Sequence, residues 1–544
     1  MTRLAALLAA LPLVAASPAA DPISADRLSA DVKVLASDAF GGRAPGTPGE
    51  TKTIDWLVAQ FKAAGLEPGG SDGGWTQPVP LIRTMLGSGA VAANGMPLAI
   101  GRDVYLSTVR PDARAVVARA PLVFVGYGVT APERQWDDFK GVDLKGKVAV
   151  FLVNDPDFEA AAGDDAAGRF GDRRMTYYGR WTYKFEEAAR RGAVAALIVH
   201  DTPGAGYGWA TVTAPGGENY DVAAPAAPRL AMQGWLEGGA ATRLFAAAGL
   251  DLARLRAAAR RSDFRPVALA GAGLSADLPV TVTRATSHNV LAKRTGRGRP
   301  DETVIYGAHW DAYGEGTPDA AGRRIRPGAN DDALGTAGVL AIARAAARMP
   351  RPARTQVFAL WTGEERGLLG SETYAAHPLY PAAKTVANLT LDILQTAGPA
   401  RDVLLVGAGQ NSLEAALAAA ARAQGRSVTP EALPERGLFY RADHFSLARR
   451  GVPTLLLMAI SGAPDLVDGG RAAGQRWLDD YMRCYHQTCD AWSADWNLAG
   501  AAADVDLLRR IGFDLAAGTA WPTWNAGSEF RAIRAASAAD RERR

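Results

Sequence analysis

The sequence predicts an α/β fold in which a mostly parallel central sheet is sandwiched by helices and interrupted by a β-rich insert. From about Ser287 onward, short apolar runs with the composition of buried strands alternate with helical stretches. Such alternation favours a parallel sheet with both faces covered. Between residues 115 and 280 the pattern changes to short β-rich runs separated by polar turns. At 544 residues the chain is long enough for two or three domains.

The amino-terminal segment has the pattern of a secretory signal. Arg3 is followed by an apolar run and then by small residues that end at Ala20. A transmembrane anchor is the alternative, but the apolar run is shorter than the ~20 residues that a span needs. We therefore expect residues 1–20 to be a cleaved signal peptide, and the mature protein to be periplasmic or extracellular with no membrane span.

Residues 21–114 are expected to form the first part of the domain that carries the sheet. Residues 24–35 look helical, a Gly- and Pro-rich loop follows, and residues 51–64 have the apolar face of an amphipathic helix. The insert, residues 115–280, contains "PLVFVGYGV" and "GKVAVFLV" as strand-like runs and "YKFEEAARRGAVAALIVHD" as a helix followed by a strand. We find no cluster of catalytic side chains in the insert.

Residues 281–544 carry the α/β alternation. Their helical stretches include "GTAGVLAIARAAARM" and "SLEAALAAAARAQG". Their strand-like runs are "NVLAKR", "ETVIYGA", "TQVFALWT", "VANLTLDI", "DVLLVGAG" and "PTLLLMA".

Charge and cysteine content exclude some classes of function. The net charge is only +3 at pH 7, which argues against a nucleic-acid partner or an anionic membrane surface. The two cysteines, Cys484 and Cys489, lie close together in "CYHQTC". We expect a small local disulfide, as an exported protein permits. A zinc thiolate site is the alternative, although an isolated pair lacks the usual second pair.

Polar side chains collect at the ends of the predicted strands. In open α/β sheets, ligands bind outside the carboxyl ends of the strands. The residues found there are His309 and Asp311, Asp331 and Asp332 before a helix, Glu364 and Glu365 in "WTGEERGL", Asp392 in "LTLDILQ", Asp443 and His444 in "YRADHFSL", and His486 and Asp490 in "YHQTCD".

Taken singly, most of these residues have an ordinary structural explanation. Asp331 or Asp332 could cap the following helix, and a lone His309 after a strand is more often a core imidazole. Asp392, inside an apolar run, is harder to explain because a buried carboxylate is costly without a partner or cation. Several carboxylates in one crevice would repel one another unless cations lay among them.

Imidazole together with carboxylate is a ligand set that suits zinc, and two metal ions ~3.5–4 Å apart are a recognised hydrolytic device. Such a site needs one carboxylate that touches both ions and an unligated one that takes a proton from water. Neighbouring side chains on a tight turn diverge, so one of Glu364 and Glu365 can bind metal while the other faces the substrate. Their spacing does not decide which.

The order of these motifs resembles a known family. The stretches "GAHWDAYG", "GANDDALGTA", "TGEERGLLGS", "LDILQ", "YRADHFSLARRGVP" and "YHQTCD" are similar to those of the co-catalytic zinc exopeptidases of metallopeptidase family twenty-eight. That family includes bacterial secreted aminopeptidases and glutamate carboxypeptidases. The insert resembles the protease-associated (PA) domain of some members. "LASDAFGGRAPGTPGE" and "WPTWNAGSEFRAIR" also look like that subgroup, so the resemblance covers nearly the whole mature chain.

The resemblance implies a zinc-exopeptidase fold and two zinc ions per chain. It assigns His309 and Asp392 to one ion and Glu365 and His486 to the other. Asp331 would bridge the two ions. His444 is the alternative to His486 as the last ligand, but the family places that ligand in the "YH" stretch.

The resemblance also implies roles in catalysis. Glu364 would be the general base and then the proton donor, and Asp311 would hold the His309 ring. Tyr485 matches a position that can donate its hydroxyl to a tetrahedral oxyanion. Arg441 is expected either to hold a carbonyl or carboxylate of the substrate or to be a surface arginine.

Other residues fill supporting positions or depart from the family pattern. Asp332 is expected to be a helix-start carboxylate rather than a ligand. A disulfide beside His486 would stiffen the ligand loop. Leu334, Thr390 and Ala442 stand where a small polar residue, Asn and Ser are usual. None of these departures removes a ligand, so they bear on substrate preference more than on the reaction.

These expectations describe an exported di-zinc metallopeptidase that removes a terminal residue from peptides, most simply from the amino end. The alternatives are a carboxypeptidase of the glutamate carboxypeptidase type, which an arginine cluster in the pocket would favour, and another amide hydrolase or cyclase. A binding protein that has lost the chemistry is disfavoured because all five ligands are present. The oligomeric state is left open.

Overall fold

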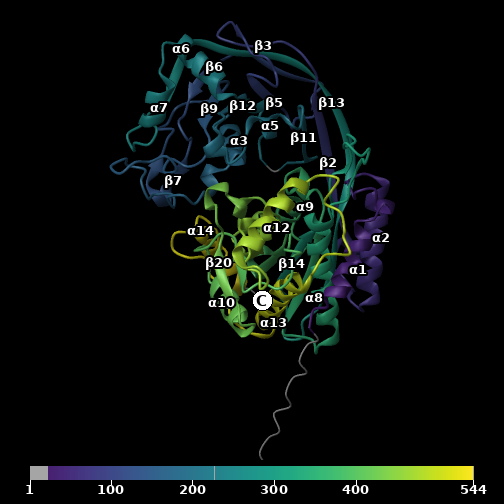
Figure 1. Ribbon diagram of the computed structural model, residues 1–544. Helices are drawn as coiled ribbons and strands as arrows, with labels where there is room; N and C mark the ends of the chain where they lie inside the picture. The colour runs from purple at the N-terminus through teal and green to yellow at the C-terminus, as the bar shows by residue number, and fades with distance from the viewer. Residues whose placement is uncertain (1–21, 226, 543–544) are drawn as a thin grey trace, which may run out of the picture.

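The computed structural model describes residues 22–225 and 227–542, and the predicted signal peptide lies outside them. Two units lie one above the other in Figure 1, joined by the long strands β2 (Thr76–Leu86) and β13 (Val267–Arg294). Within the described residues, no helix combines the length and apolar character that crossing a membrane requires.

The lower unit contains the predicted mostly parallel sheet. Its strand order is β21, β18, β14, β17 and β13. The first four are parallel to one another, whereas β13 runs antiparallel to β17. Every residue of β17 and β18 is buried, which explains why these strands read as continuous apolar runs. The bounds are β14 (Arg299–His309), β17 (Arg354–Trp361), β18 (Thr385–Leu391) and β21 (Thr454–Leu457).

Helices cover both faces of this sheet, as predicted. Val304 and Tyr306 of β14 pack into one core, while Ile305 between them packs into another, because successive side chains of a strand point to opposite faces. The first core holds α1 (Ala25–Leu35), α2 (Pro48–Ala63), α8 (Gly335–Arg348), α10 (Leu413–Ala423) and α13 (Ala499–Ala517). The second holds α9 (Leu369–Ala376) and α11 (His444–Ala448).

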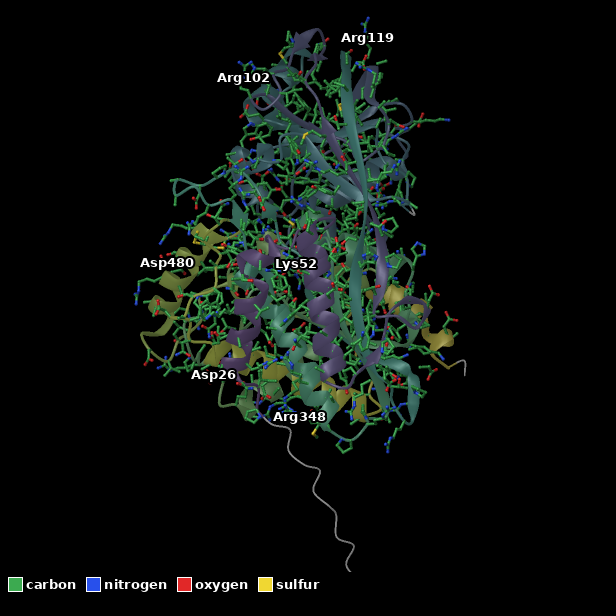
Figure 2. All side chains as sticks on the ribbon, turned by 90° about the vertical axis from the view of Figure 1, so that its right-hand side faces the viewer. Asp26, Lys52, Arg102, Arg119, Arg348 and Asp480 are labelled. Atoms are coloured by element: carbon green, nitrogen blue, oxygen red, sulfur yellow. A yellow bond between two sulfur atoms is a disulfide. The ribbon has the colours of Figure 1, made fainter. Side chains whose placement is uncertain are left out.

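The two amino-terminal helices lie on the outside of the lower unit. Both face the viewer in Figure 2, where exposed Asp26 of α1 and Lys52 of α2 are labelled. The helix predicted at 51–64 begins earlier, at Pro48, because proline is well tolerated in the first turn, where its missing N–H costs nothing.

The upper unit is a second α/β layer structure. Its strands β6 (Arg114–Phe124), β9 (Val148–Leu152), β10 (Ala195–Val199) and β12 (Met232–Leu236) are parallel. Helix α3 (Trp181–Arg190) packs on one face, and α6 (Gly238–Ala247) with α7 (Leu252–Ala258) packs on the other. β3 (Val91–Ala93) pairs with β13, and β5 (Val104–Ser107) pairs with β12. The structure therefore joins residues 91–107 to this unit, upstream of the boundary expected at residue 115.

Strand β13 ties the two units together. Its first half pairs with β6 of the upper unit, its middle with β2, and its end with β17 of the lower unit.

The run at 402–409 does not join the central sheet, since β19 (Asp402–Leu405) pairs only with β20 (Ser427–Pro430). The remaining elements are β1 (Glu67–Pro68), β4 (Met96–Pro97), β7 (Thr130–Ala131), β8 (Trp136–Asp137), α4 (Thr202–Ala205), α5 (Trp209–Thr213), β11 (Glu218–Val222), β15 (Gly314–Glu315), β16 (Ile325–Arg326), α12 (Gly470–Cys484), α14 (Arg531–Ala536) and α15 (Ala538–Glu542).

Candidate metal centre

The parallel strands of the lower unit bring the predicted ligands to one edge of the sheet. His309 is the last residue of β14, and Asp392 directly follows the neighbouring strand β18. Glu364 and Glu365 lie in a short turn of 3-10 helix after β17, the neighbour of β14 on its other side. These residues meet because the carboxyl ends of adjacent parallel strands share an edge.

Asp331 lies between the two histidines. Its Oδ1 is 3.2 Å from His309 Nε2, and its Oδ2 is 3.1 Å from His486 Nε2. On the His486 side, Glu365 Oε2 is 3.2 Å from the same Nε2 atom. On the His309 side, Asp392 Oδ1 is 4.0 Å from His309 Nε2. Glu364 Oε2 is also 4.0 Å from His309 Nε2. Asp331 thus contacts both imidazoles, and each imidazole has at least one further carboxylate near its Nε2 atom.

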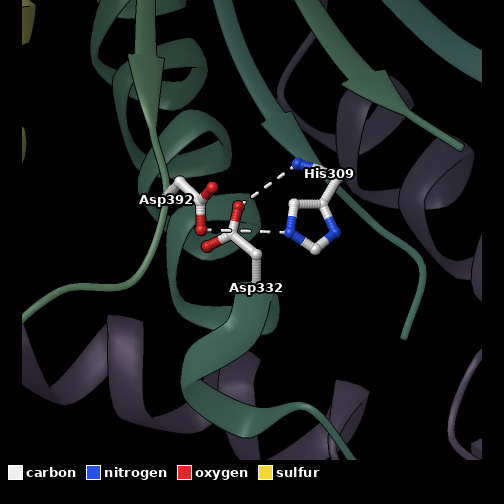
Figure 3. A group of neighbouring side chains, drawn as sticks. All are labelled: His309, Asp332 and Asp392. Atoms are coloured by element: carbon white, nitrogen blue, oxygen red, sulfur yellow. Dashed lines mark hydrogen bonds and ion pairs between the residues drawn. The ribbon is translucent and has the colours of Figure 1, made fainter. Parts of the chain in front are cut away.

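Asp332 has a different environment (Figure 3). Its carboxylate accepts hydrogen bonds from the backbone N–H groups of His309 and Gly335, at 3.2 and 2.8 Å. The second bond holds the start of α8, as expected for a helix-start carboxylate. The ligand atoms of Asp332, His309 and Asp392 nevertheless lie within 4.8 Å of one another, as do those of Asp331, Glu365 and His486. These are the two groups in the described residues that could each hold an ion.

The His309 ring is held from behind by Asp311. His309 Nδ1 lies 3.1 Å from the backbone carbonyl oxygen of Asp311 and 3.6 Å from its carboxylate Oδ1. That same Oδ1 accepts the backbone N–H of Glu364 at 3.2 Å. With a proton on Nδ1, Nε2 presents a lone pair toward Asp331 and Asp392. Asp311 therefore positions both the His309 ring and the turn that carries Glu364.

Two supporting residues were given no role by the sequence reasoning, which listed Asp490 among the strand-end residues and did not single out Arg43. The carboxylate of Asp490 accepts the backbone N–H groups of Asn330 and Asp331, at 3.0 and 3.1 Å. Fully buried Arg43 donates to four backbone carbonyls, among them those of Trp310 and Gly328. Both brace the loop that carries Asp331. The only sequence signals were an aspartate at the end of "YHQTCD" and an arginine in a Gly-rich loop.

The buried carboxylates of the centre repel one another. Burial raises the pKa of Glu364 and of Glu365 well above the usual range, and neighbouring carboxylates add to the effect. Burial and the charge of Asp331 raise the pKa of Asp392 to about 8. For Asp331 itself burial acts the same way, but hydrogen bonds with His309 and His486 outweigh it and lower its pKa. Groups that cannot all be charged together need cations among them.

The donor set fits a pair of zinc ions. Asp392 Oδ1 is buried and has no hydrogen-bond partner among the described residues, although it faces His309. A buried carboxylate oxygen without a partner is costly unless a cation binds it. Two imidazoles and several carboxylates are the ligands that zinc prefers in hydrolytic sites.

His486 lies in a loop closed by a disulfide. Cys484, the last residue of α12, is bonded to Cys489, with their Cα atoms 5.1 Å apart. The backbone of His486 has a φ of 62°, which a side-chain-bearing residue rarely adopts. Its ring lies 3.6 Å from the ring of Tyr485, between centroids. His444, the alternative ligand, packs on Phe439 instead, and neither of its ring nitrogens has a hydrogen-bond partner among the described residues.

A cavity of roughly 1070 Å³ opens over the centre and is walled by both units. From the lower unit, its lining includes Glu364, Tyr485 and Arg441. From the upper unit it includes Arg180 and Tyr207, so the insert contributes directly to the space above the predicted ligands.

Residues 289–508 match peptidase family M28. The matched segment begins within β13 and ends within α13, so it contains every residue of the candidate centre.

Several curated proteins are similar to this chain over part of their length. Aminopeptidase Y of Saccharomyces cerevisiae is 29% identical over 211 residues, which is 38% of this chain and 34% of that protein. The probable lipoprotein aminopeptidase LpqL of Mycobacterium tuberculosis is 27% identical over 237 residues, 40% of this chain and 44% of that protein. A probable zinc metalloprotease of Pyrenophora tritici-repentis is 36% identical over 117 residues, 22% of this chain and 23% of that protein. The chain thus spans less than half the length of these relatives.

Solved structures are similar over most of the chain. An aminopeptidase from Aneurinibacillus sp. strain AM-1 is 21% identical, with 92% of this chain and 95% of that chain covered and a TM-score of 0.49. BSAP, a zinc aminopeptidase from Bacillus subtilis, is 16% identical, with 94% and 99% covered and a TM-score of 0.44.

Proposed function

We propose that this M28 protein is an exported di-zinc exopeptidase that removes the amino-terminal residue of peptides. The observation that carries the proposal is the position of Asp331, whose two carboxylate oxygens lie 3.2 and 3.1 Å from His309 and His486. A carboxylate that reaches two imidazoles, each with a further carboxylate, is what a pair of neighbouring divalent ions requires.

The ligand set divides between the two sides of Asp331. His309 and Asp392 would hold one zinc ion, Glu365 and His486 would hold the other, and Asp331 would bridge them. When bound, such a pair of ions polarises the scissile carbonyl and acidifies a water molecule.

The other polar groups would act on the substrate and on protons. Glu364 lines the cavity and is not needed as a ligand, so it is the group available to take the proton from water and pass it to the leaving amine. Asp311 would position it through the bond to its backbone N–H. Tyr485, which lines the cavity beside His486, would donate its hydroxyl to the oxyanion, and Arg441 would bind a polar group of the substrate.

Export and access fit the same proposal. The amino-terminal sequence has a signal-peptide pattern, and a disulfide such as the one beside His486 is common in oxidising compartments and rare in the cytosol. The upper unit, which resembles a PA domain in sequence, would roof the cavity and restrict it to short or flexible peptides.

The choice of the amino end is supported by the names of the relatives, several of which are aminopeptidases. A specific observation favours the carboxypeptidase alternative, because Arg180 and Arg441 both line the cavity and could hold a terminal carboxylate.

A panel of free and amino-blocked dipeptides, assayed with and without a chelator, separates these activities. We expect hydrolysis of the free dipeptides only, abolished by the chelator and restored by zinc. Cleavage of amino-blocked peptides from the carboxyl end would overturn the choice of terminus. Hydrolysis that survives exhaustive removal of metal would overturn the zinc mechanism.

A further inference from the structure

Arg180 is the exception among the buried arginines of the described chain. Its side chain is only 8% exposed, yet it forms no hydrogen bond or ion pair with a described residue, and its Nε is buried without a partner. Its guanidinium carbon lies over the ring of Trp181, 5.9 Å from the ring centroid. The other buried arginines all donate to carbonyls or carboxylates: Arg43, Arg294, Arg354, Arg426, Arg509 and Arg534. A buried guanidinium without a partner is costly, so its retention calls for an explanation.

Arg180 faces the cavity above the metal centre. It immediately precedes helix α3 of the upper unit, and it lines the cavity together with Arg441 of the lower unit. The charge of Arg441 lowers the pKa of Arg180 and acts against the increase in the pKa of Asp392. Arg441 is therefore close enough to interact electrostatically with both a predicted ligand and Arg180.

Carboxylates elsewhere on the cavity wall do not neutralise this pair, because each already binds another arginine. Glu186 Oε2 is 2.9 Å from Arg449, and Asp221 Oδ2 is 2.5 Å from Arg229. The other two wall carboxylates outside the centre have arginine partners as well: Glu218 with Arg83, and Glu372 with Arg449. No side-chain hydrogen bond or ion pair is formed by Arg441 either, within the part of the chain that the structure describes.

The two unpaired cations also act on each other. Burial and the charge of Arg441 lower the pKa of Arg180 to about 10. An anion between the two guanidinium groups would relieve both the burial and the repulsion, and the planar fork of arginine suits a bidentate carboxylate.

We propose that Arg180 and Arg441 form a carboxylate-binding subsite, built from both units, that selects peptides carrying a carboxylate beside the scissile bond. The proposal rests on the proposed function, since it names the substrate class of the same cavity. The carboxylate has two sources, the carboxyl terminus of a short peptide or an acidic side chain next to the cleaved bond. Both offer the same chemistry to the arginines.

Substrate pairs that differ only in one charge distinguish the two sources. A dipeptide and its carboxyl-terminal amide isolate the terminal carboxylate. A glutamate and a glutamine residue, each in an amidated dipeptide, isolate the side chain. For the zinc-loaded protein we expect kcat/KM to favour the charged member of one pair by about tenfold to a hundredfold, the range that hydrogen bonds to charged groups carry.

Substitution of Arg180 then tests whether this residue is the source of the preference. R180Q should reduce the charged-to-neutral ratio to near one, mainly through KM, and R180K should keep part of it because the charge remains while the fork is lost. R229Q is the matched control, since it removes a cation from the same cavity wall that Asp221 already pairs, and its ratio should stay at the wild-type value. Thermal unfolding of each variant shows whether it is folded.

The subsite can be tested apart from turnover. The same pairs are titrated by calorimetry into zinc-loaded E364Q and E364Q/R180Q proteins, which retain the subsite or lack it without the proposed base. Equal binding of charged and neutral members to E364Q, or an unchanged preference in E364Q/R180Q, would overturn the subsite even if the peptidase activity stands. Absence of hydrolysis by the wild type, with a carboxylate preference in E364Q, would overturn the proposed function and leave the subsite.

Discussion

Two of the carboxylate clusters buried in the described residues are stabilised in different ways. In the upper unit, the charge of Lys184 acts on buried Asp138 and Asp155, and its ammonium group donates to the carbonyls of Tyr127 and Asn154 at 2.6 and 3.1 Å. Every oxygen of the two aspartates accepts a hydrogen bond, from Val129, Trp136 and Thr176. In the lower unit, seven acidic side chains lie around His309, and no lysine or arginine of the described chain is bonded to them: Asp311, Asp331, Asp332, Glu364, Glu365, Asp392 and Asp443.

The difference separates a structural cluster from a functional one. The upper cluster contains its own cation and leaves no oxygen of the two aspartates without a partner. The lower one leaves Asp311 Oδ2, Asp392 Oδ1 and Asp443 Oδ1 buried without partners. Because unpaired buried charge is expensive, the lower cluster must receive its cations from outside the chain.

The largest effect is expected at the bridging position. D331N removes the negative charge that lies next to both imidazoles, so the protein should lose both zinc ions and all measurable peptidase activity. D332N is the control, because an amide oxygen still accepts the N–H of Gly335 and the helix start is kept. Zinc content measured by mass spectrometry after dialysis checks both. If D331N kept two zinc ions, or if D332N lost both, Asp332 rather than Asp331 would be the residue that holds the two ions.

Glu364 should matter for turnover rather than for metal. E364Q keeps the size of the side chain but cannot accept a proton, so kcat should fall by about 10²–10⁴-fold, the usual contribution of a general base. Both zinc ions should remain, because Glu364 is not needed as a ligand. Steady-state kinetics with parallel zinc analysis test this. If E364Q lost an ion while E365Q kept both, the two glutamates would have each other's roles.

The upper cluster offers the reverse experiment, because its cation is covalently part of the chain. K184M removes the charge that acts on Asp138 and Asp155 together with two buried hydrogen bonds, and removing one partner from a group of buried charges typically costs about 3–5 kcal/mol. The free energy of unfolding should fall by that amount, while the two zinc ions still bind. Chemical denaturation with and without a chelator measures both, and independent clusters should give additive losses. A loss of zinc from folded K184M would contradict the separation of the two clusters.

Sequence reasoning predicted the parts of the centre that depend on local order along the chain. Asp392 was recognisable because a carboxylate interrupts an apolar run, and Glu364 and Glu365 because they follow a buried strand directly. Parallel pairing then brings strand ends together without further information.

Partners distant along the chain were not predictable in the same way. Asp490 braces a loop 160 positions away, and Arg43 reaches one 285 positions away. Arg180 acquires its meaning only because α3 packs over the lower unit. Neither periodicity nor composition encodes such contacts, since they depend on how complete units pack.

The smallest expected effect distinguishes the two sides of the centre itself. His309 is only 2% exposed at its side chain and is held by the sheet and Asp311, whereas His486 is 27% exposed and lies in the loop between the two cysteines. Replacing both cysteines in C484S/C489S should therefore loosen His486 alone. The affinity for one of the two zinc ions should fall by about 10–100-fold, as for other groups that orient a ligand. The affinity for the other ion should stay unchanged. Competition with a zinc-binding dye resolves the two steps, and reductant should reproduce the change in the wild type. Equal weakening of both steps would mean that the disulfide stabilises the whole centre rather than the His486 loop.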